Sequence, residues 1–392
     1  MTGAYLVLLQ LLLLARLPWL ERAVGLDRLA SWHRGLGTNV VILLCGHVLL
    51  IVAGVGLTEK ETPWSATWEV LTTYPDMLLA VIGITLFLAV AITSGRFLRA
   101  RLSYESWYWI HVTTYVAVAL SFFHQISAGA DFVMVPAARL LWIGLYAAVA
   151  LCVLCWRVAI PARGWFHHAL SVDRVVQETP NTVSVWLRGR HLGELNARPG
   201  QFFLWRFVTV GHLWSAHPYS LSAAARDDRL RITVKALGDH SHGLARLRRG
   251  VPVFAEGPFG HFTAQTRRRP GVLLIAGGAG IGPVRALAGE LLGQGGDIAV
   301  LYRASSWDDV ALRGELDRLA KHGLRVRYLV GRRSDLGHDP LDRRGLRRLV
   351  PDVVHRDVYV CGPEGMTATV CATLRGLGVA RQQIHTEEFS LR

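Results

Sequence analysis

Apolar residues are concentrated in the first 160 positions of this 392-residue chain. Five long apolar segments follow one another there, separated by polar stretches. All but the first are long enough to cross a hydrocarbon layer about 30 Å thick as helices. The first segment is weaker, because Arg16 and Pro18 interrupt it. The segments are Tyr5–Leu20, Gly35–Leu57, Met77–Ser94, Trp107–Ile126 and Phe132–Trp156.

The charges of the connecting stretches predict an orientation, because Lys and Arg are retained on the cytoplasmic side of a membrane. Arginines dominate residues 21–34 and 95–101, whereas residues 58–76 carry four carboxylates against Lys60. We therefore expect the first two stretches, and everything after Arg157, to be cytoplasmic in a multi-pass protein of the plasma membrane. Five spans leave the N-terminus outside, unless a first helix is missing.

Four histidines lie on the second and fourth segments. Ionisable side chains at membrane depth are rare, and imidazole is a common axial ligand of haem iron. Spacings of 14 and 13 residues correspond to roughly 20 Å along a helix, enough to stack two haems across a bilayer. We expect His33 and His111 to hold an inner b-type haem, and His47 and His124 an outer one. Any single histidine of this kind is more often a hydrogen-bonded core residue.

The two spacings are not equivalent on a helix. A spacing of 14 residues returns within about 40° of the same face, whereas 13 residues miss that face by about 140°. The fourth segment should therefore contain a bend or a π-bulge, or its haem is approached from another side.

Residues 163–266 contain short β-rich runs that alternate with turns, which predicts a small antiparallel β-barrel. Within it, the aromatic ring and hydroxyl of residues 217–220 suit the face and polar edge of a flavin, although such a strand alone is more often ordinary core. A turn at residues 238–241 offers donors for a pyrophosphate and leads into a helix N-terminus, which favours anions. The candidate flavin-binding residues are His217, Pro218, Tyr219, Ser220, Lys235, Gly238, His240 and Ser241.

Residues 267–392 change to buried strands that alternate with helices, which predicts a doubly wound parallel sheet. A glycine turn after the first strand can approach dinucleotide phosphates, but it also suits any tight strand-to-helix connection. Cys361 ends a later strand and either borders the nicotinamide or is a buried structural cysteine. Arginines after the second and third strands can clamp a 2′-phosphate, with solvated arginines as the alternative. The candidates are Gly277, Gly278, Gly280, Gly282, Pro283, Arg303, Ser305, Arg332, Cys361, Gly362 and Pro363.

The net charge of +14 at pH 7 could indicate nucleic-acid binding. The arginines are scattered, however, without the clustering and interleaved aromatic residues of a nucleic-acid groove. We therefore expect no nucleic acid as a partner. The expected partners are a lipid bilayer and a small-molecule electron acceptor. The oligomeric state is not predicted.

Together these motifs resemble the ferric reductase and NADPH oxidase superfamily over nearly the whole chain. The paired histidines resemble its haem ligands, residues 217–220 its His-Pro-Phe-Thr flavin segment, and residues 277–283 its nicotinamide turn. Cys361-Gly-Pro363 matches outright, and the resemblance implies that Phe389 covers the flavin ring until nicotinamide displaces it. Gly282 departs from the family, which often has Thr there, and the family commonly has six spans.

The resemblance implies three domains: a helical transmembrane haem domain (1–162), an FAD-binding β-barrel (163–266) and a ferredoxin reductase-like NAD(P)-binding domain (267–392). It implies hydride transfer from NADPH, or alternatively NADH, to FAD near Cys361 and Phe389. Single electrons would then pass through two haems to oxygen, giving superoxide, or to ferric iron.

Two other functions compete with this one. A membrane-tethered flavin reductase serving a separate redox partner should carry an iron–sulfur C-x4-C-x2-C run, which the sequence lacks. A non-catalytic haem-binding membrane sensor would not need the flavin and nicotinamide segments.

Overall fold

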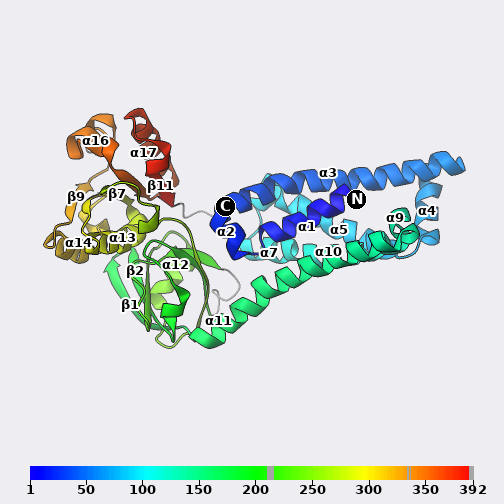
Figure 1. The fold of residues 1–392 in the computed structure, drawn as a ribbon, viewed down its shortest axis with the longest axis horizontal. Coiled ribbons are helices and arrows are strands. Elements are labelled where there is room, and N and C mark those ends of the chain that lie inside the picture. The colour runs from blue at the N-terminus through cyan, green and yellow to red at the C-terminus, as the bar shows by residue number, and fades with distance from the viewer. Residues whose placement is uncertain (210–215, 333–334, 336, 388–392) are drawn as a thin grey trace. The chain divides into compact units, whose positions relative to one another are not determined.

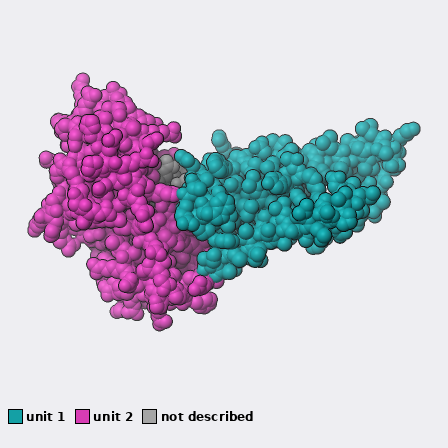
Figure 2. All heavy atoms as spheres, in the orientation of Figure 1, with its two compact units in different colours: residues 1–160 teal, residues 161–392 magenta. Residues whose placement is uncertain are grey.

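The computed structural model describes residues 1–209, 216–332, 335 and 337–387, with only the backbone of Asp27, Asp239 and His240. The chain divides into two compact units, residues 1–160 and 161–392 (Figure 2). The first is helical and the second contains three β-sheets (Figure 1).

Apolar helices build the first unit, and many of their large side chains point outward. Leu50 on α3 is 74% exposed and Leu141 on α10 is 75% exposed. Helices that are apolar on their outer faces are typical of membrane spans. The helices are α1 (Thr2–Leu13), α2 (Pro18–Val24), α3 (Leu26–Glu59), α4 (Pro63–Thr73), α5 (Met77–Ser94), α6 (Arg96–Arg99), α7 (Tyr104–Val112), α8 (Thr114–Ala128), α9 (Ala130–Met134) and α10 (Pro136–Leu154).

Among the described residues, three helices are long and apolar enough to cross a membrane: residues 28–59, 77–94 and 136–168. A fourth span exists if α1 and α2, which meet at 86°, are counted as one. Length and composition of single helices thus support three or four of the five expected spans. The predicted segment Met77–Ser94 coincides with α5, whereas the predicted segment Trp107–Ile126 is not one continuous helix.

The break in that segment lies at Thr113, between His111 and His124. The Thr113 amide donates to the Ile110 carbonyl at 3.1 Å, three residues back, so the helix tightens before α8 begins. A bend in this segment is one of the two alternatives that the 13-residue histidine spacing leaves open. A π-helical turn occurs elsewhere, at Cys155–Ala159, where α10 continues into α11 (Ile160–His168).

The first half of the second unit consists of two three-stranded antiparallel sheets. One contains β1 (Ser171–Thr179), β2 (Thr182–Arg188) and β5 (Arg229–Lys235), and the other β4 (His217–Ser220), β3 (Phe202–Phe207) and β6 (Val253–Phe259). Isolated bridges, Ser171 to Pro252 and Leu221 to Ile232, join the sheets at both edges. Alternate side chains such as Val185 and Trp205 fill the core. We call this half the flavin lobe.

The second half, the nicotinamide lobe, has a five-stranded parallel sheet in the order β11-β10-β7-β8-β9. Apolar residues of α13 and α14 pack on one face, and those of α16 and α17 pack on the other. The strand order reverses beside β7, so the predicted doubly wound sheet is present. Its elements are β7 (Gly271–Gly277), α13 (Ile281–Gly293), β8 (Asp297–Ala304), α14 (Arg313–Ala320), β9 (Arg325–Val330), α16 (Arg343–Leu349), β10 (Asp357–Cys361), α17 (Glu364–Gly376) and β11 (Ile384–Glu387).

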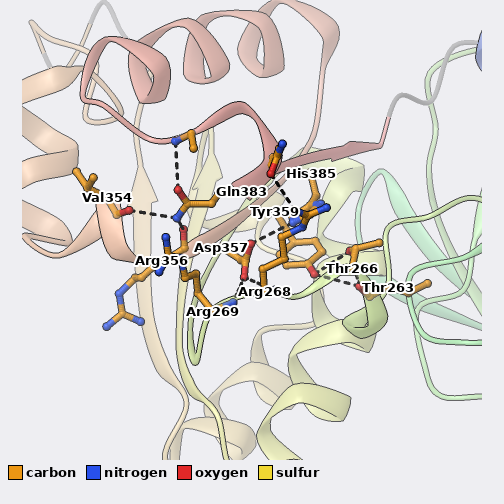
Figure 3. Close-up of polar contacts among 12 residues, drawn as sticks. Thr263, Thr266, Arg268, Arg269, Val354, Arg356, Asp357, Tyr359, Gln383 and His385 are labelled. Atoms are coloured by element: carbon orange, nitrogen blue, oxygen red, sulfur yellow. Dashed lines mark hydrogen bonds and ion pairs between the residues drawn. The ribbon is translucent and has the colours of Figure 1, made fainter.

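A buried carboxylate connects β10, β11 and the segment that joins the two lobes (Figure 3). Asp357 accepts hydrogen bonds from the backbone amides of Arg268 at 2.6 Å and Arg269 at 2.5 Å. Its other oxygen lies 3.3 Å from His385 Nε2, and the His385 ring stacks on Tyr359 at 4.4 Å. Burial lowers the pKa of His385, against the opposing effect of Asp357. These contacts fix the position of β11 relative to the joining segment.

Asp357→Ala should lower the melting temperature of the second unit by about 5 °C or more. Two backbone amides would lose their buried acceptor, at about 1–3 kcal/mol each. Circular dichroism of the detergent-solubilised protein measures the shift. Gln382→Ala is the matched control, because it removes only an exposed bond of 2.9 Å to Arg268 and should change the melting temperature by less than about 2 °C. Equal shifts for both variants would contradict this role of Asp357.

Candidate active site

The glycine turn after β7 and the end of β10 lie against each other. Gly278 has a φ of +53°, and α13 begins at residue 281. A Cβ atom on Gly280 would lie 2.0 Å from the Cys361 carbonyl, and one on Gly277 would lie 2.5 Å from Met366 Sδ. Only glycine permits this approach. Two of the predicted nicotinamide segments therefore meet at the switch point of the sheet, where ligands of such folds bind.

The first turn of α13 faces the flavin lobe. A Cβ atom on Gly282 would come within 3.4 Å of Ser222 Cβ and 3.7 Å of Thr233 Cβ, which is ordinary contact. The free amides of this helix start favour an anion. Pro283, in the first turn, is buried and lacks an amide hydrogen that would need a partner.

Cys361 is fully buried, and its thiol donates to the Glu387 carbonyl at 3.8 Å. Burial raises the pKa of this thiol, so it stays protonated and does not act as a thiolate nucleophile. Gly362 packs tightly, because a Cβ atom there would meet Met366 Cε at 2.5 Å, and Pro363 precedes α17. Phe389 lies outside the described residues.

The strand β4 presents alternating side chains, as the flavin prediction requires. His217 and Tyr219 share a face, with ring centres 6.3 Å apart and planes 16° from parallel. Trp205 Nε1 donates to the Tyr219 carbonyl at 2.9 Å, and burial raises the pKa of the Tyr219 phenol. On the opposite face, next to Pro218, the Ser220 hydroxyl is buried and has no hydrogen-bond partner among the described atoms. A buried hydroxyl of this kind is expected to form a hydrogen bond with a ligand or with water.

The predicted phosphate turn is closed by its own serine. Ser241 Oγ accepts from the amides of Leu237 at 2.8 Å and Gly238 at 3.0 Å, at the start of α12 (Asp239–Gly243). No described atom lies within 4 Å of a Cβ atom on Gly238, so the described part of the turn leaves that side open. Lys235 forms an ion pair with Asp309 at 3.0 Å, which the sequence pattern did not predict. The side chain of His240 is outside the described residues.

The residues expected at a 2′-phosphate differ in their contacts. Arg303 Nη1 donates to the carbonyls of Ala304 at 2.8 Å and Leu329 at 2.9 Å, so part of its guanidinium links β8 to β9. Ser305 and Arg332 are exposed after the same two strands. All three therefore lie at the carboxyl edge of the sheet.

A buried ion cluster between the lobes was not predicted. Arg231 on β5 is 2% exposed, pairs with Glu315 on α14, and donates to the Ser222 carbonyl at 2.6 Å. Arg285 Nε lies 2.5 Å from the same carboxylate. Burial opposes ionisation of Glu315, but the two arginines lower its pKa overall. The alternation of polar and apolar residues along β5 predicts a solvated polar face, so the burial of Arg231 had no signal in the sequence pattern.

In the helical unit, His33 and His111 lie together, with ring centres 6.0 Å apart and planes at 63°. His33 Nδ1 is 3.3 Å from the Gln10 carbonyl. The Nδ1 atoms of His111 and His124 are buried without a hydrogen-bond partner among the described atoms. His47 lies further along α3, and His124 lies on α8 beyond the break.

Three family models match successive parts of the chain. Residues 1–122 match the ferric reductase like transmembrane component, and residues 170–263 match an FAD-binding domain. Residues 274–372 match the oxidoreductase NAD-binding domain. The matches follow the helical unit, the flavin lobe and the nicotinamide lobe in order.

Two individual relatives and a solved structure each match less than two thirds of the chain. A flavohemoprotein of Chromobacterium violaceum is 30% identical over 237 residues, 54% of this chain and 58% of that protein. Ferredoxin–NADP reductase B of Sorangium cellulosum is 31% identical over 174 residues, 41% of this chain and 71% of that protein. The solved ferredoxin reductase in carbazole 1,9a-dioxygenase has 24% identity and a TM-score of 0.49, covering 57% of this chain and 69% of that chain. The chain thus spans little more than half of the flavohemoprotein.

The helical unit has apolar helices of membrane-spanning length, and the two lobes have the folds of flavin and nicotinamide domains. A ferric reductase like component followed by these two domains is the architecture of one group of flavocytochromes. The chain therefore has the domain architecture of ferric reductase and NADPH oxidase-like flavocytochromes, with the membrane, flavin and nicotinamide domains of an NAD(P)H-dependent oxidoreductase.

Proposed function

We propose that the protein moves electrons from cytoplasmic NADPH, through FAD and two b-type haems, to an extracytoplasmic acceptor. The observation that carries the proposal is the approach of His33 on α3 and His111 on α7, 6.0 Å between ring centres, within the apolar helical unit of a chain that also has both soluble lobes. Buried imidazoles without partners are costly in such helices unless they serve a ligand. The acceptor is oxygen, giving superoxide, or a ferric chelate.

The flavin lobe fits FAD at β4. FAD, when bound, converts a two-electron donor into single-electron traffic. The Ser220 hydroxyl, buried and unpartnered, would donate to the polar edge of the ring system, and Tyr219 would pack on its face. Trp205 Nε1 donates to the Tyr219 carbonyl at 2.9 Å, which fixes the position of the Tyr219 backbone. The open side of Gly238 would take the pyrophosphate, assisted by His240.

The nicotinamide lobe fits NADPH at the carboxyl edge of its sheet. Gly277, Gly280 and Gly362 let the glycine turn pack directly on the end of β10 and the start of α17, and the α13 amides beside this contact would bind the pyrophosphate. The protonated Cys361 thiol would border the nicotinamide without attacking it. Arg303, Ser305 and Arg332 would hold the 2′-phosphate, and Phe389 would cover the flavin until nicotinamide replaces it.

The helical unit fits haem through its histidines. Haem, when bound, supplies a single-electron carrier within the membrane. His33 and His111 would ligate the inner haem, and His47 and His124 the outer one. The Gln10 carbonyl accepts from His33 Nδ1, which fixes the tautomer and leaves Nε2 for iron.

Ser220→Ala should slow flavin reduction by NADPH about tenfold, which corresponds to about 1.4 kcal/mol and to one lost hydrogen bond. Stopped-flow absorbance of FAD-loaded protein measures the rate. Because Ser220 Oγ has no protein partner, the melting temperature of the FAD-free protein should not change. Ser220→Thr should restore the rate. A full rate in the alanine variant would exclude the hydroxyl from flavin binding.

His111→Ala should reduce the haem content from two to one per chain. The pyridine haemochrome spectrum of purified protein measures this, and acceptor reduction should fall to background while flavin reduction continues. His355→Ala removes an exposed histidine and should retain both haems. If the wild-type protein binds flavin but no haem, a membrane-tethered flavin reductase replaces this proposal. If it binds haem but its flavin is not reduced by NADPH, a haem-binding sensor replaces it.

Arg332→Ala should raise the KM for NADPH about tenfold or more and leave the KM for NADH nearly unchanged. The expected loss is one charge-assisted contact with the 2′-phosphate. Steady-state reduction of an artificial acceptor with both donors provides the measurement. Arg347→Ala on the exposed side of α16 is the charge-matched control. Equal effects on both donors would remove Arg332 from nucleotide selection.

A further inference from the structure

A cavity lies within the second unit, between the outer face of the flavin lobe and helices α13 and α14. Its volume is about 500 Å³. Figure 1 labels β1, β2, α13 and α14, four of the elements that border it. Six arginines line it: Arg174, Arg226, Arg229, Arg231, Arg285 and Arg318.

The cavity carries uncompensated positive charge. Glu315 is the one carboxylate among the described residues of its lining. Outside the lining, Asp173 lies 3.5 Å from Arg174, and Asp228 lies 3.1 Å from Arg229. The six arginines and three carboxylates together have a net charge of +3, not counting His322 in the lining. The arginine side chains that line one cavity repel one another, so a bound anion would stabilise the site.

Part of the site is held rigid before any ligand binds. The Trp186 ring has the Arg174 guanidinium 4.7 Å from its centre and the Arg231 guanidinium 5.0 Å away. Arg318 Nε donates to the Gly314 carbonyl at 3.1 Å. Fixed guanidinium groups lose little entropy when they bind an anion.

The cavity is separate from the nicotinamide edge. Arg229 begins β5, whereas Lys235 ends it and pairs with Asp309 beyond the carboxyl end of β8. Seven residues of strand span roughly 20 Å. Arg318 belongs to the nicotinamide lobe and Arg226 to the flavin lobe, so one ligand could contact both lobes.

We propose that this cavity binds a small polyanion bearing two or more phosphate groups and that the bound anion ties the two lobes together. Guanidinium groups match phosphate oxygens in bidentate geometry, and the volume suits a small ligand. The phosphates could come from a free di- or triphosphate or from anionic lipid headgroups. The proposal concerns binding alone and does not depend on the acceptor or the haems.

Calorimetric titration of inorganic tripolyphosphate into FAD-loaded protein saturated with NADP⁺ tests the proposal. We expect saturable binding that Arg226→Gln combined with Arg318→Gln weakens at least tenfold. Both side chains are exposed, and no ion pair is found for either among the described residues, so this variant should fold. Arg347→Gln with Arg348→Gln on α16 changes the charge equally and should leave the affinity unchanged. Absent binding, or equal binding by all three proteins, overturns the proposal.

The same titration in lipid nanodiscs separates the two sources. If anionic lipid occupies the cavity, phosphatidylglycerol in the nanodisc should weaken tripolyphosphate binding at least threefold relative to phosphatidylcholine, and only when Arg226 and Arg318 are present. If a free phosphate is the ligand, the affinity should be the same in both nanodiscs.

Discussion

The buried pairing of Arg231 with Glu315 determines how the two soluble lobes meet. Arg231 extends from β5, Glu315 from α14, and Arg285 from α13 approaches the same carboxylate. Removing Glu315 would leave both arginines without their carboxylate, and Arg231 is only 2% exposed, so the loss would be expensive. The packing of the first turn of α13 against Ser222 follows from this contact. A flavin and a nicotinamide held by separate lobes can exchange hydride only if that geometry is fixed.

In the helical unit the corresponding constraint is the cost of imidazole in an apolar environment. His111 and His124 have buried nitrogens without partners among the described atoms, and His33 has a partner only through Gln10. A metal-bound macrocycle would remove that cost, and it would also explain why the helix breaks at Thr113. The same residues would thus serve folding and electron transfer.

Local patterns predicted the elements whose side chains repeat regularly. Met77–Ser94 is uniformly apolar and is α5, and the β-rich run at residues 230–235, one of those expected within residues 163–266, lies in β5. Two features escaped prediction. One is the position of the interruption in Trp107–Ile126, which the histidine spacing led us to expect but which hydropathy could not place at Thr113. The partners of Arg231 and Lys235 are 84 and 74 residues away, so only the tertiary fold brings them together.

The central claim is that electrons reach the membrane helices from the flavin lobe. Rapid anaerobic mixing of NADPH with FAD-loaded protein, followed by absorbance of flavin and haem bands, tests it most directly. The account predicts that the flavin bleaches first and that reduced b-type haem bands appear afterwards, then disappear when oxygen or a ferric chelate is admitted. Flavin bleaching with haem that stays oxidised would contradict it.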